Sequence, residues 1–152
     1  MDGVIVEIYI SPHGGSPMEK VEHVEAVVGG GLRGDRYMER TGYWSGVDEC
    51  QVTLIEQEAL DEIGAESDIR VSNGEHRRNL ITRGIRLEGL WGKRFTIGEA
   101  VLEYDRPRPP CAYIQSITQQ GMTRALRSPR GGLCVRVVKA GVIRAGDSIC
   151  LE

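Results

Sequence analysis

The sequence has no long hydrophobic run, no Cys-x-x-Cys pair and few lysines. Its apolar stretches fall well short of the roughly 20 residues that a membrane-spanning helix needs. The N-terminal MDGVIVEIYI also lacks the basic flank of a secretory signal. These absences predict a cytoplasmic protein with no membrane partner, and the net charge of −3 predicts no general attraction to nucleic acid.

The four cysteines and three histidines do not form a known metal-binding motif. Cys50, Cys111, Cys134 and Cys150 are far apart in the sequence, as are the histidines, so a structural zinc site is not expected. Because cytoplasmic thiols stay reduced, a disulfide framework is not expected either. Cys134 and Cys150 are interpreted as packing residues. For Cys50, at the border of a polar loop and a strand, burial is favoured over a role as a resolving thiol.

Lysine is scarce, with three lysines against sixteen arginines. Guanidinium groups suit bidentate recognition of phosphate or carboxylate. A biased base composition of the genome would give the same excess without any ligand, and it is the favoured explanation of the total. The length of 152 residues, with 40% apolar and 27% charged residues, fits one globular domain spanning residues 1–152.

Short segments with apolar alternation outnumber segments with helical periodicity. Together with Gly-rich turns, such as the one at Gly98, they predict a mainly β fold with a few short helices, arranged as a barrel or a sandwich. The predicted strands are Val4–Tyr9, Val21–Val28, Gln51–Leu54, Arg94–Ile97, Ala100–Tyr104, Leu133–Lys139 and Ser148–Leu151.

Two segments have helical periodicity. After Val52, four apolar residues fall on one helical face, Thr53 and Glu56 resemble a capping box, and Gly64 is placed to end the helix. A second helix is expected after Cys111, up to Ser128. Cys111 would then lie near a helix start, where the helix dipole favours its thiolate form.

Cys111 follows the segment DRPRPP, which supplies the positive charge of Arg106 and Arg108 and a backbone restricted by prolines. A nucleophile or a metal ligand suits this setting, whereas the neighbouring apolar residues fit a plain core cysteine equally well. Ile117 stands where a cysteine phosphatase needs arginine, and nothing in the sequence supports a Cys-His hydrolase. A glycine pattern at 29–34 is followed by no amphipathic helix, which excludes a dinucleotide-binding turn.

A second polar cluster, His76-Arg77-Arg78-Asn79, precedes the apolar pair Leu80-Ile81. Its two cations and its amide could hold a phosphate. From spacing alone, a solvated start of a strand is the favoured interpretation.

Five segments follow one another along nearly the whole chain: GLRGDRY (31–37), QVTLI (51–55), RRNLITRGIRLEGLWGKRFTIGEAVLE (77–103), RPRPPCAYI (106–114) and GGLCVRVVKAGVIRAGDSI (131–149). Their order and spacing resemble those of the MOSC domain, named after the C-terminal domain of molybdenum cofactor sulfurases. The resemblance implies a closed mixed β-barrel of the MOSC (pyruvate-kinase-barrel-like) type.

The resemblance further implies that the molybdenum cofactor, a pterin dithiolene with a phosphate, is bound. Cys111 matches the family's molybdenum-ligating cysteine, and a thiolate is a soft ligand suited to that metal. Arg77 and Asn79 match the family's R-x-N pattern, while Arg78 stands where related sequences often have proline. The remaining cofactor-binding residues implied are Arg33 and Arg36, one of which is expected to point inward, and Arg106 and Arg108.

Three functions remain open. The leading one is an oxidoreductase that reduces small N-hydroxylated or N-oxygenated substrates, with Cys111 as molybdenum ligand and catalytic residue. The others are a sulfur carrier with a persulfide on Cys111 and a non-catalytic barrel that binds an anion. The sequence has no pyridoxal phosphate domain, iron–sulfur cysteine set or flavin motif. The oxidoreductase would therefore need a separate redox partner protein, and the sulfur carrier would need a separate sulfur donor.

Overall fold

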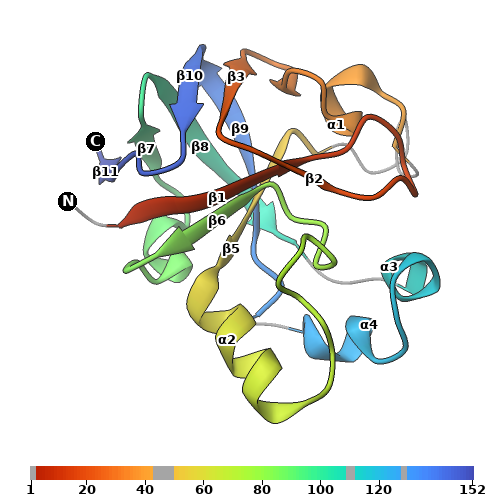
Figure 1. Cartoon of the computed structure of the whole chain (residues 1–152). Coiled ribbons are helices and arrows are strands. Elements are labelled where there is room, and N and C mark those ends of the chain that lie inside the picture. Colours follow the sequence, from red (N-terminus) through yellow and green to blue (C-terminus); the bar gives the residue numbers. More distant parts are fainter. Residues whose placement is uncertain (1–2, 43–49, 109–111, 128–129) are drawn as a thin grey trace.

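The computed structural model describes residues 3–42, 50–108, 112–127 and 130–152 (Figure 1). Cys111, on which the sequence-based site centres, lies outside these ranges. The elements, in chain order, are β1 (Val4–Ile10), β2 (Glu19–Val21), β3 (His23–Val27), β4 (Gly31–Leu32), α1 (Arg36–Glu39), β5 (Val52–Glu56), α2 (Gln57–Glu66), β6 (Leu80–Arg83), the 3-10 helix η1 (Leu87–Leu90), β7 (Arg94–Ile97), β8 (Ala100–Pro107), α3 (Ala112–Ile117), α4 (Met122–Ala125), β9 (Leu133–Lys139), β10 (Gly141–Arg144) and β11 (Ile149–Leu151).

The strands form a mixed eight-stranded sheet and a smaller three-stranded sheet. The large sheet has the order β11-β7-β8-β9-β5-β6-β1-β2, and the small one has the order β10-β3-β4. Among the pairings of the described strands, β5 with β6 is parallel, and α2 provides the crossover between these two strands (Figure 1). The prediction of a mainly β fold with a few short helices is confirmed.

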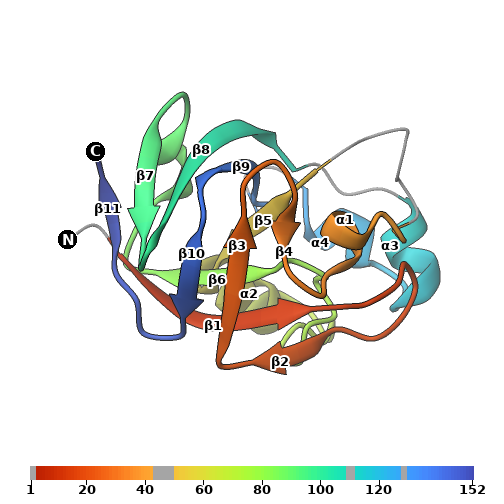
Figure 2. The ribbon, with the colours of Figure 1, turned by 90° about the horizontal axis from the view of Figure 1, so that it is seen from above.

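The two distant ends of the large sheet approach each other at β1. Val4 forms an isolated antiparallel bridge with Ser148, and the amide of Ile5 donates to the carbonyl of Asp147 at 2.9 Å. In Figure 2, β1 accordingly runs past the segment that joins β10 to β11. The ladder of the described strands still ends at β2 and β11. Full closure into a barrel therefore stays a prediction, which the bridge supports.

Successive side chains of a strand point to opposite faces of the sheet. Because consecutive residues of β5 and of β6 are buried, both faces of these two strands are covered. Leu54 and Leu80 join the main hydrophobic core, which also holds Phe95, the largest fully buried side chain among the described residues. Their neighbours Ile55 and Ile81 join a second core. The helices supply the other wall of that second core, through residues that include Leu60, Ile63, Ile114, Met122 and Leu126.

Both predicted helices differ from the observed ones at their boundaries. Thr53 lies in β5 and bonds with Asn79, so the predicted capping box is wrong, and α2 begins at Gln57 without a side-chain cap. The helix also continues past Gly64 to Glu66. The second predicted helix is two short ones, α3 and α4. Between them Gly121 has a φ of 93°, a left-handed conformation that interrupts a helix.

Candidate functional site

Four arginines with little solvent exposure lie together around α1 and the start of β6. Arg36, Arg77, Arg78 and Arg108, the arginine cluster, are 6%, 7%, 4% and 8% exposed. Arginine is rarely buried unless it is paired, because removing its charge from water is costly. Most of the remaining arginines are at the surface, so these four have a specific environment. The four residues come from three segments that are distant in the sequence.

Arg36 is held at the first position of α1 by its neighbour Asp35. Its Nη1 lies 3.1 Å from Oδ1 of Asp35, a carboxylate with no solvent exposure. The same carboxylate accepts from the amides of Ser11, at 3.0 Å, and Tyr37, at 3.3 Å, and so caps α1. Asp35 thus pins the local backbone and supplies a counter-charge to Arg36.

Arg77 occupies a tight turn before β6. Its amide donates to the carbonyl of Gly74 at 2.9 Å, and its own φ of 60° is left-handed, a conformation uncommon for residues other than glycine. Nη1 donates to the carbonyl of Ser16 at 2.6 Å, whereas the buried Nη2 has no hydrogen-bond partner in the described part of the chain. Burial, and then the charge of Arg36, lowers the pKa of Arg77 to about 10.

Arg78 extends toward the loop before β9. Its Nε donates to the carbonyl of Gly131 at 2.7 Å, and Nη1 donates to the carbonyl of His76 at 3.4 Å. Within the described ranges, its buried Nη2 has no hydrogen-bond partner. Burial, and then the charge of Arg108, lowers the pKa of Arg78 to about 10. Both Arg77 and Arg78 therefore stay charged near neutral pH, with neutral carbonyls as acceptors.

His76 is neutral in this arrangement. Its Nδ1 accepts from the amide of Arg78 at 2.9 Å, which requires an unprotonated nitrogen, and its ring meets Tyr9 edge-on at 5.5 Å. Burial, and then the charge of Arg78, lowers the pKa of His76 to about 3. His76 thus orients the turn without adding charge to it.

Tyr37 links the arginine cluster to a cavity. Its hydroxyl oxygen accepts from Nη2 of Arg36 at 3.3 Å and from Nη2 of Arg108 at 3.4 Å. The guanidinium of Arg36 also lies 4.3 Å from the ring centroid, within the range of a cation–π contact. Tyr37 is one wall of a cavity of about 380 Å³, whose lining includes Cys50, Gln51, Asp105 and Arg136.

Two of the predicted arginines are placed differently. Arg33 points outward, where its Nε pairs with Glu25 at 2.7 Å and its side chain is 58% exposed. Of the two basic residues of GLRGDRY, Arg36 is therefore the one that faces inward. Arg106 is partly buried and pairs with Asp105 at 2.7 Å, beside the cluster rather than in it.

Asn79 positions strands through its amide. Oδ1 accepts from the backbone amide and the hydroxyl of Thr53, at 3.0 and 3.1 Å, and Nδ2 donates to the carbonyl of Tyr9 at 3.0 Å. The residue has no solvent exposure. These bonds join the start of β6 to β5 and β1, so the Arg-x-Asn pattern combines an arginine of the cluster with the residue that fixes its strand.

Sequence reasoning missed the role of Tyr37, although the residue stands beside Arg36 in the same motif. It also missed Ser16 and Gly131, which contribute only backbone carbonyls and so leave no side-chain signal. A further contact joins Cys50 to Cys134, whose sulfur atoms are 2.6 Å apart. The two residues belong to segments that are distant in sequence, so no local pattern indicates this contact.

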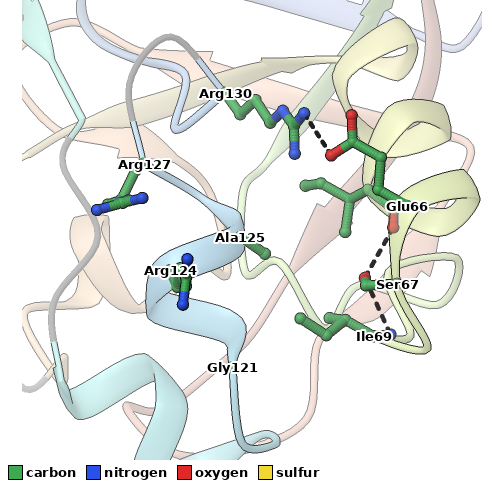
Figure 3. A pocket seen from close by; sticks show the side chains of 9 residues that line it. Glu66, Ser67, Ile69, Gly121, Arg124, Ala125, Arg127 and Arg130 are labelled. Atoms are coloured by element: carbon green, nitrogen blue, oxygen red, sulfur yellow. Dashed lines mark hydrogen bonds and ion pairs between the residues drawn. The ribbon is translucent and has the colours of Figure 1, made fainter.

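A second hollow, of about 480 Å³, lies between α2 and α4 (Figure 3). Arg124, Arg127 and Arg130 line it, and Nη2 of Arg130 pairs with Glu66 at 2.7 Å. Among the residues that the structure describes, this hollow and the cavity beside Tyr37 have no lining residue in common. In the hollow between α2 and α4, Arg130 is paired and Arg124 and Arg127 are exposed. This hollow therefore differs from the arginine cluster, whose guanidinium groups are buried.

None of the helices in the described ranges has the length and apolar character needed to cross a membrane. The His, Cys, Asp and Glu side chains of the same ranges form no group of three or more that could hold a metal ion.

Fold and site together define a small mixed-β domain that buries a cluster of guanidinium groups beside a cavity. Residues 41–150 match the family model of the MOSC domain, and the chain belongs to that family. Two solved structures share the fold. The YuaD protein from Bacillus subtilis is 19% identical with a TM-score of 0.76, over 98% of this chain and 94% of that chain. YiiM from Geobacillus stearothermophilus is 17% identical with a TM-score of 0.75, over 99% and 75%.

YiiM from Escherichia coli has the same fold, with 18% identity and a TM-score of 0.68 over 99% of this chain and 69% of that chain. No curated protein gives a significant sequence match. Identities this low establish the common fold, and the chemistry has to be argued from the site itself.

Proposed function

We propose that this MOSC domain binds the molybdenum cofactor and that its arginine cluster holds the cofactor's phosphate. The observation that carries the proposal is the pair of buried Nη2 atoms of Arg77 and Arg78, which lack hydrogen-bond partners within the described ranges. A buried donor left unsatisfied costs about 1–3 kcal/mol, and more when it is charged. A bound anion would offset this cost with charge-assisted hydrogen bonds.

The chemistry of the donors fits a phosphate-bearing group. Guanidinium presents planar, paired donors that match phosphate oxygens, and both residues remain charged near neutral pH because their pKa values are about 10. Tyr37 and Arg36 would position Arg108 and Arg77 around the same anion. The cavity of about 380 Å³ beside Tyr37 is of the size that small-molecule sites have.

Cys111 would supply the thiolate ligand of molybdenum, as the family resemblance implies. When bound, the cofactor supplies two-electron oxygen-atom chemistry. We propose that the substrate is a small N-hydroxylated or N-oxygenated compound and that a separate protein donates the electrons. In this scheme Cys111 is the catalytic residue, and the arginine cluster binds and orients the cofactor without taking part in the redox step.

The test is to express the full chain in a host that makes the cofactor and to measure molybdenum and pterin in the purified protein. We expect both in a stoichiometric amount, together with reduction of an N-hydroxylated amidine by a reduced viologen dye. The variant Arg78→Met should lower the cofactor content at least about tenfold, since it removes a charged hydrogen bond of about 1.5–3 kcal/mol. Cys111→Ser should abolish the reduction.

Arg33→Met is the matched control, because it makes the same arginine-to-methionine change at an exposed ion pair. It should leave the cofactor content unchanged. Protein without molybdenum and pterin would overturn the proposal. If such protein still bound inorganic phosphate through Arg78, the domain would instead be a non-catalytic anion-binding domain, which the arginine cluster by itself also favours.

A further inference from the structure

We propose that Cys50 and Cys134 form a redox-active dithiol that an oxidant converts into an intramolecular disulfide. The two sulfur atoms lie 2.6 Å apart although the residues are 84 positions apart in the sequence. Both thiols are free and buried in the structure. This inference concerns residues outside the arginine cluster and does not depend on the proposed cofactor.

The strand ladder fixes the approach of the two sulfurs. Cys134 is the register partner of Thr53 where β9 pairs with β5, and Val135 is the partner of Val52. Cys50 stands two residues before Val52, and its Sγ lies 3.7 Å from the carbonyl oxygen of that residue. Backbone pairing therefore holds Cys134, and the contact with the Val52 carbonyl holds Cys50 just before the start of β5. A bond of about 2.05 Å between their sulfurs needs a closer approach of only about half an ångström.

The electrostatic setting divides the two thiols into a donor and an acceptor. Cys50 donates its S–H to the sulfur of Cys134. This hydrogen bond, together with the charges of Arg108, Arg106 and Arg78, lowers the pKa of Cys134 against the opposing effect of burial. The same bond and burial raise the pKa of Cys50. Cys134 is therefore the thiol of the pair that loses its proton more readily, and the hydrogen bond gives the proton of Cys50 a path to the Cys134 sulfur.

Access differs between the two sulfurs as well. Cys134 has no solvent exposure, whereas Cys50 lines the cavity beside Tyr37 and is 4% exposed. A small oxidant that enters this cavity therefore reaches Cys50 first. Cys134, behind it, is placed to resolve the oxidised form.

With a hydroperoxide as oxidant, the chemistry takes two steps. Cys134 gives up its proton to solvent and takes the proton of Cys50, and the Cys50 thiolate then attacks one peroxide oxygen. The O–O bond breaks, the other oxygen takes a proton from solvent and leaves as water or an alcohol, and Cys50 becomes a sulfenic acid. Cys134 then loses its proton and attacks the Cys50 sulfur, so that an S–S bond forms, the S–O bond breaks and water leaves. The two thiols lose two electrons, the peroxide gains them, and a dithiol reductant reverses the change.

The experiment treats the purified full chain with a small excess of hydrogen peroxide, then blocks the remaining thiols with N-ethylmaleimide after unfolding. We expect free thiols to fall from four to two and the intact mass to fall by two hydrogens, with Cys50 and Cys134 in one cross-linked peptide. Dithiothreitol should restore four thiols. The thermal midpoint should be higher in the oxidised protein, because the cross-link restricts the unfolded chain.

The variants Cys50→Ser and Cys134→Ser should each lose the cross-link, and Cys150→Ser is the control that should keep it. If Cys134→Ser does not fold, Cys50→Ser carries the comparison, since that residue lies outside the strand. The inference is overturned if peroxide oxidises Cys111 while Cys50 and Cys134 both take up N-ethylmaleimide. It is also overturned if the cross-linked peptides join any other pair of cysteines.

Discussion

Arg36 donates a hydrogen bond from Nη2 to the backbone carbonyl of Arg77, at 3.1 Å and across 41 positions of sequence. This bond ties the first residue of α1 to the turn before β6. It places two like charges close together, and the charge of Arg36 contributes to the lowered pKa of Arg77. The cluster therefore depends on groups that hold Arg36 in place, above all Asp35.

The variant Asp35→Asn should destabilise the protein by about 3 kcal/mol, because it leaves a buried guanidinium without its counter-charge while keeping the shape of the side chain. Urea unfolding at neutral pH measures the change. Glu25→Gln, which breaks the exposed ion pair of Arg33, is the control and should cost less than about 1 kcal/mol. Equal effects of the two substitutions would contradict the structural role of Asp35.

The variant Asn79→Ala should destabilise the protein by about 3 kcal/mol. It leaves the amide of Thr53 and the carbonyl of Tyr9 buried without the bonds that the Asn79 side chain supplies. Asn73→Ala, at an exposed position of the preceding loop, should change the free energy of unfolding by less than about 0.5 kcal/mol. Chemical denaturation of both variants makes the comparison, and a loss below about 1 kcal/mol for Asn79→Ala would count against its bridging role.

His76 should make stability fall with acidification. Its pKa drops from 6.5 to about 3 on folding, so below about pH 6.5 the unfolded chain binds a proton that the folded chain does not. The contribution is complete above pH 6.5 and is lost as the pH falls toward 3, and from pH 7 to 5 it amounts to about 2 kcal/mol. Guanidinium unfolding at the two pH values measures it.

The control for His76 is His76→Asn, which keeps an acceptor for the Arg78 amide but does not titrate. Its stability should fall less between pH 7 and 5 than that of the native protein, and carboxylates contribute equally to both. Identical losses would show that His76 is already protonated or solvated in the folded state.

Gly64→Ala should stabilise the protein by about 0.5–1 kcal/mol. Gly64 lies inside α2, and a methyl group there meets no atom within 4 Å, so alanine only reduces the freedom of the unfolded chain. The opposite is expected for Gly132→Ala, because Gly132 has a φ of 89° and its added carbon would collide with the carbonyl of Leu54. Thermal unfolding of the two variants should shift the midpoint in opposite directions.

The sequence predicted the strands β7 and β9 at their observed bounds. In β7 polar and apolar residues alternate and a turn follows, whereas β9 is marked by its content of valine. It did not predict β6, since the run Leu80-Ile81 is buried on both faces and shows no alternation. The break at Gly121 had a visible signal, because glycine is poorly suited to a helix interior, but the apolar spacing on both sides masked it.

The residues of the site were partly predictable. The pattern Arg-x-Asn and the motif GLRGDRY named Arg77, Asn79 and Arg36, yet only the fold shows that Arg33 points outward. The contact of Cys50 with Cys134 depends on the pairing of β5 with β9. Register between strands so distant in the chain is decided by the whole core, which no local pattern describes.

The bridge between Val4 and Ser148 has a consequence for synthesis of the chain. β2 follows β1 closely in the chain, but the partners of β1 at β6 and at Ser148 are synthesised only much later. Until then the nascent chain carries an apolar strand whose edge toward β6 is unpaired, which is the feature that promotes association between chains. We therefore expect a shortage of chaperones during synthesis to reduce the soluble yield of this domain.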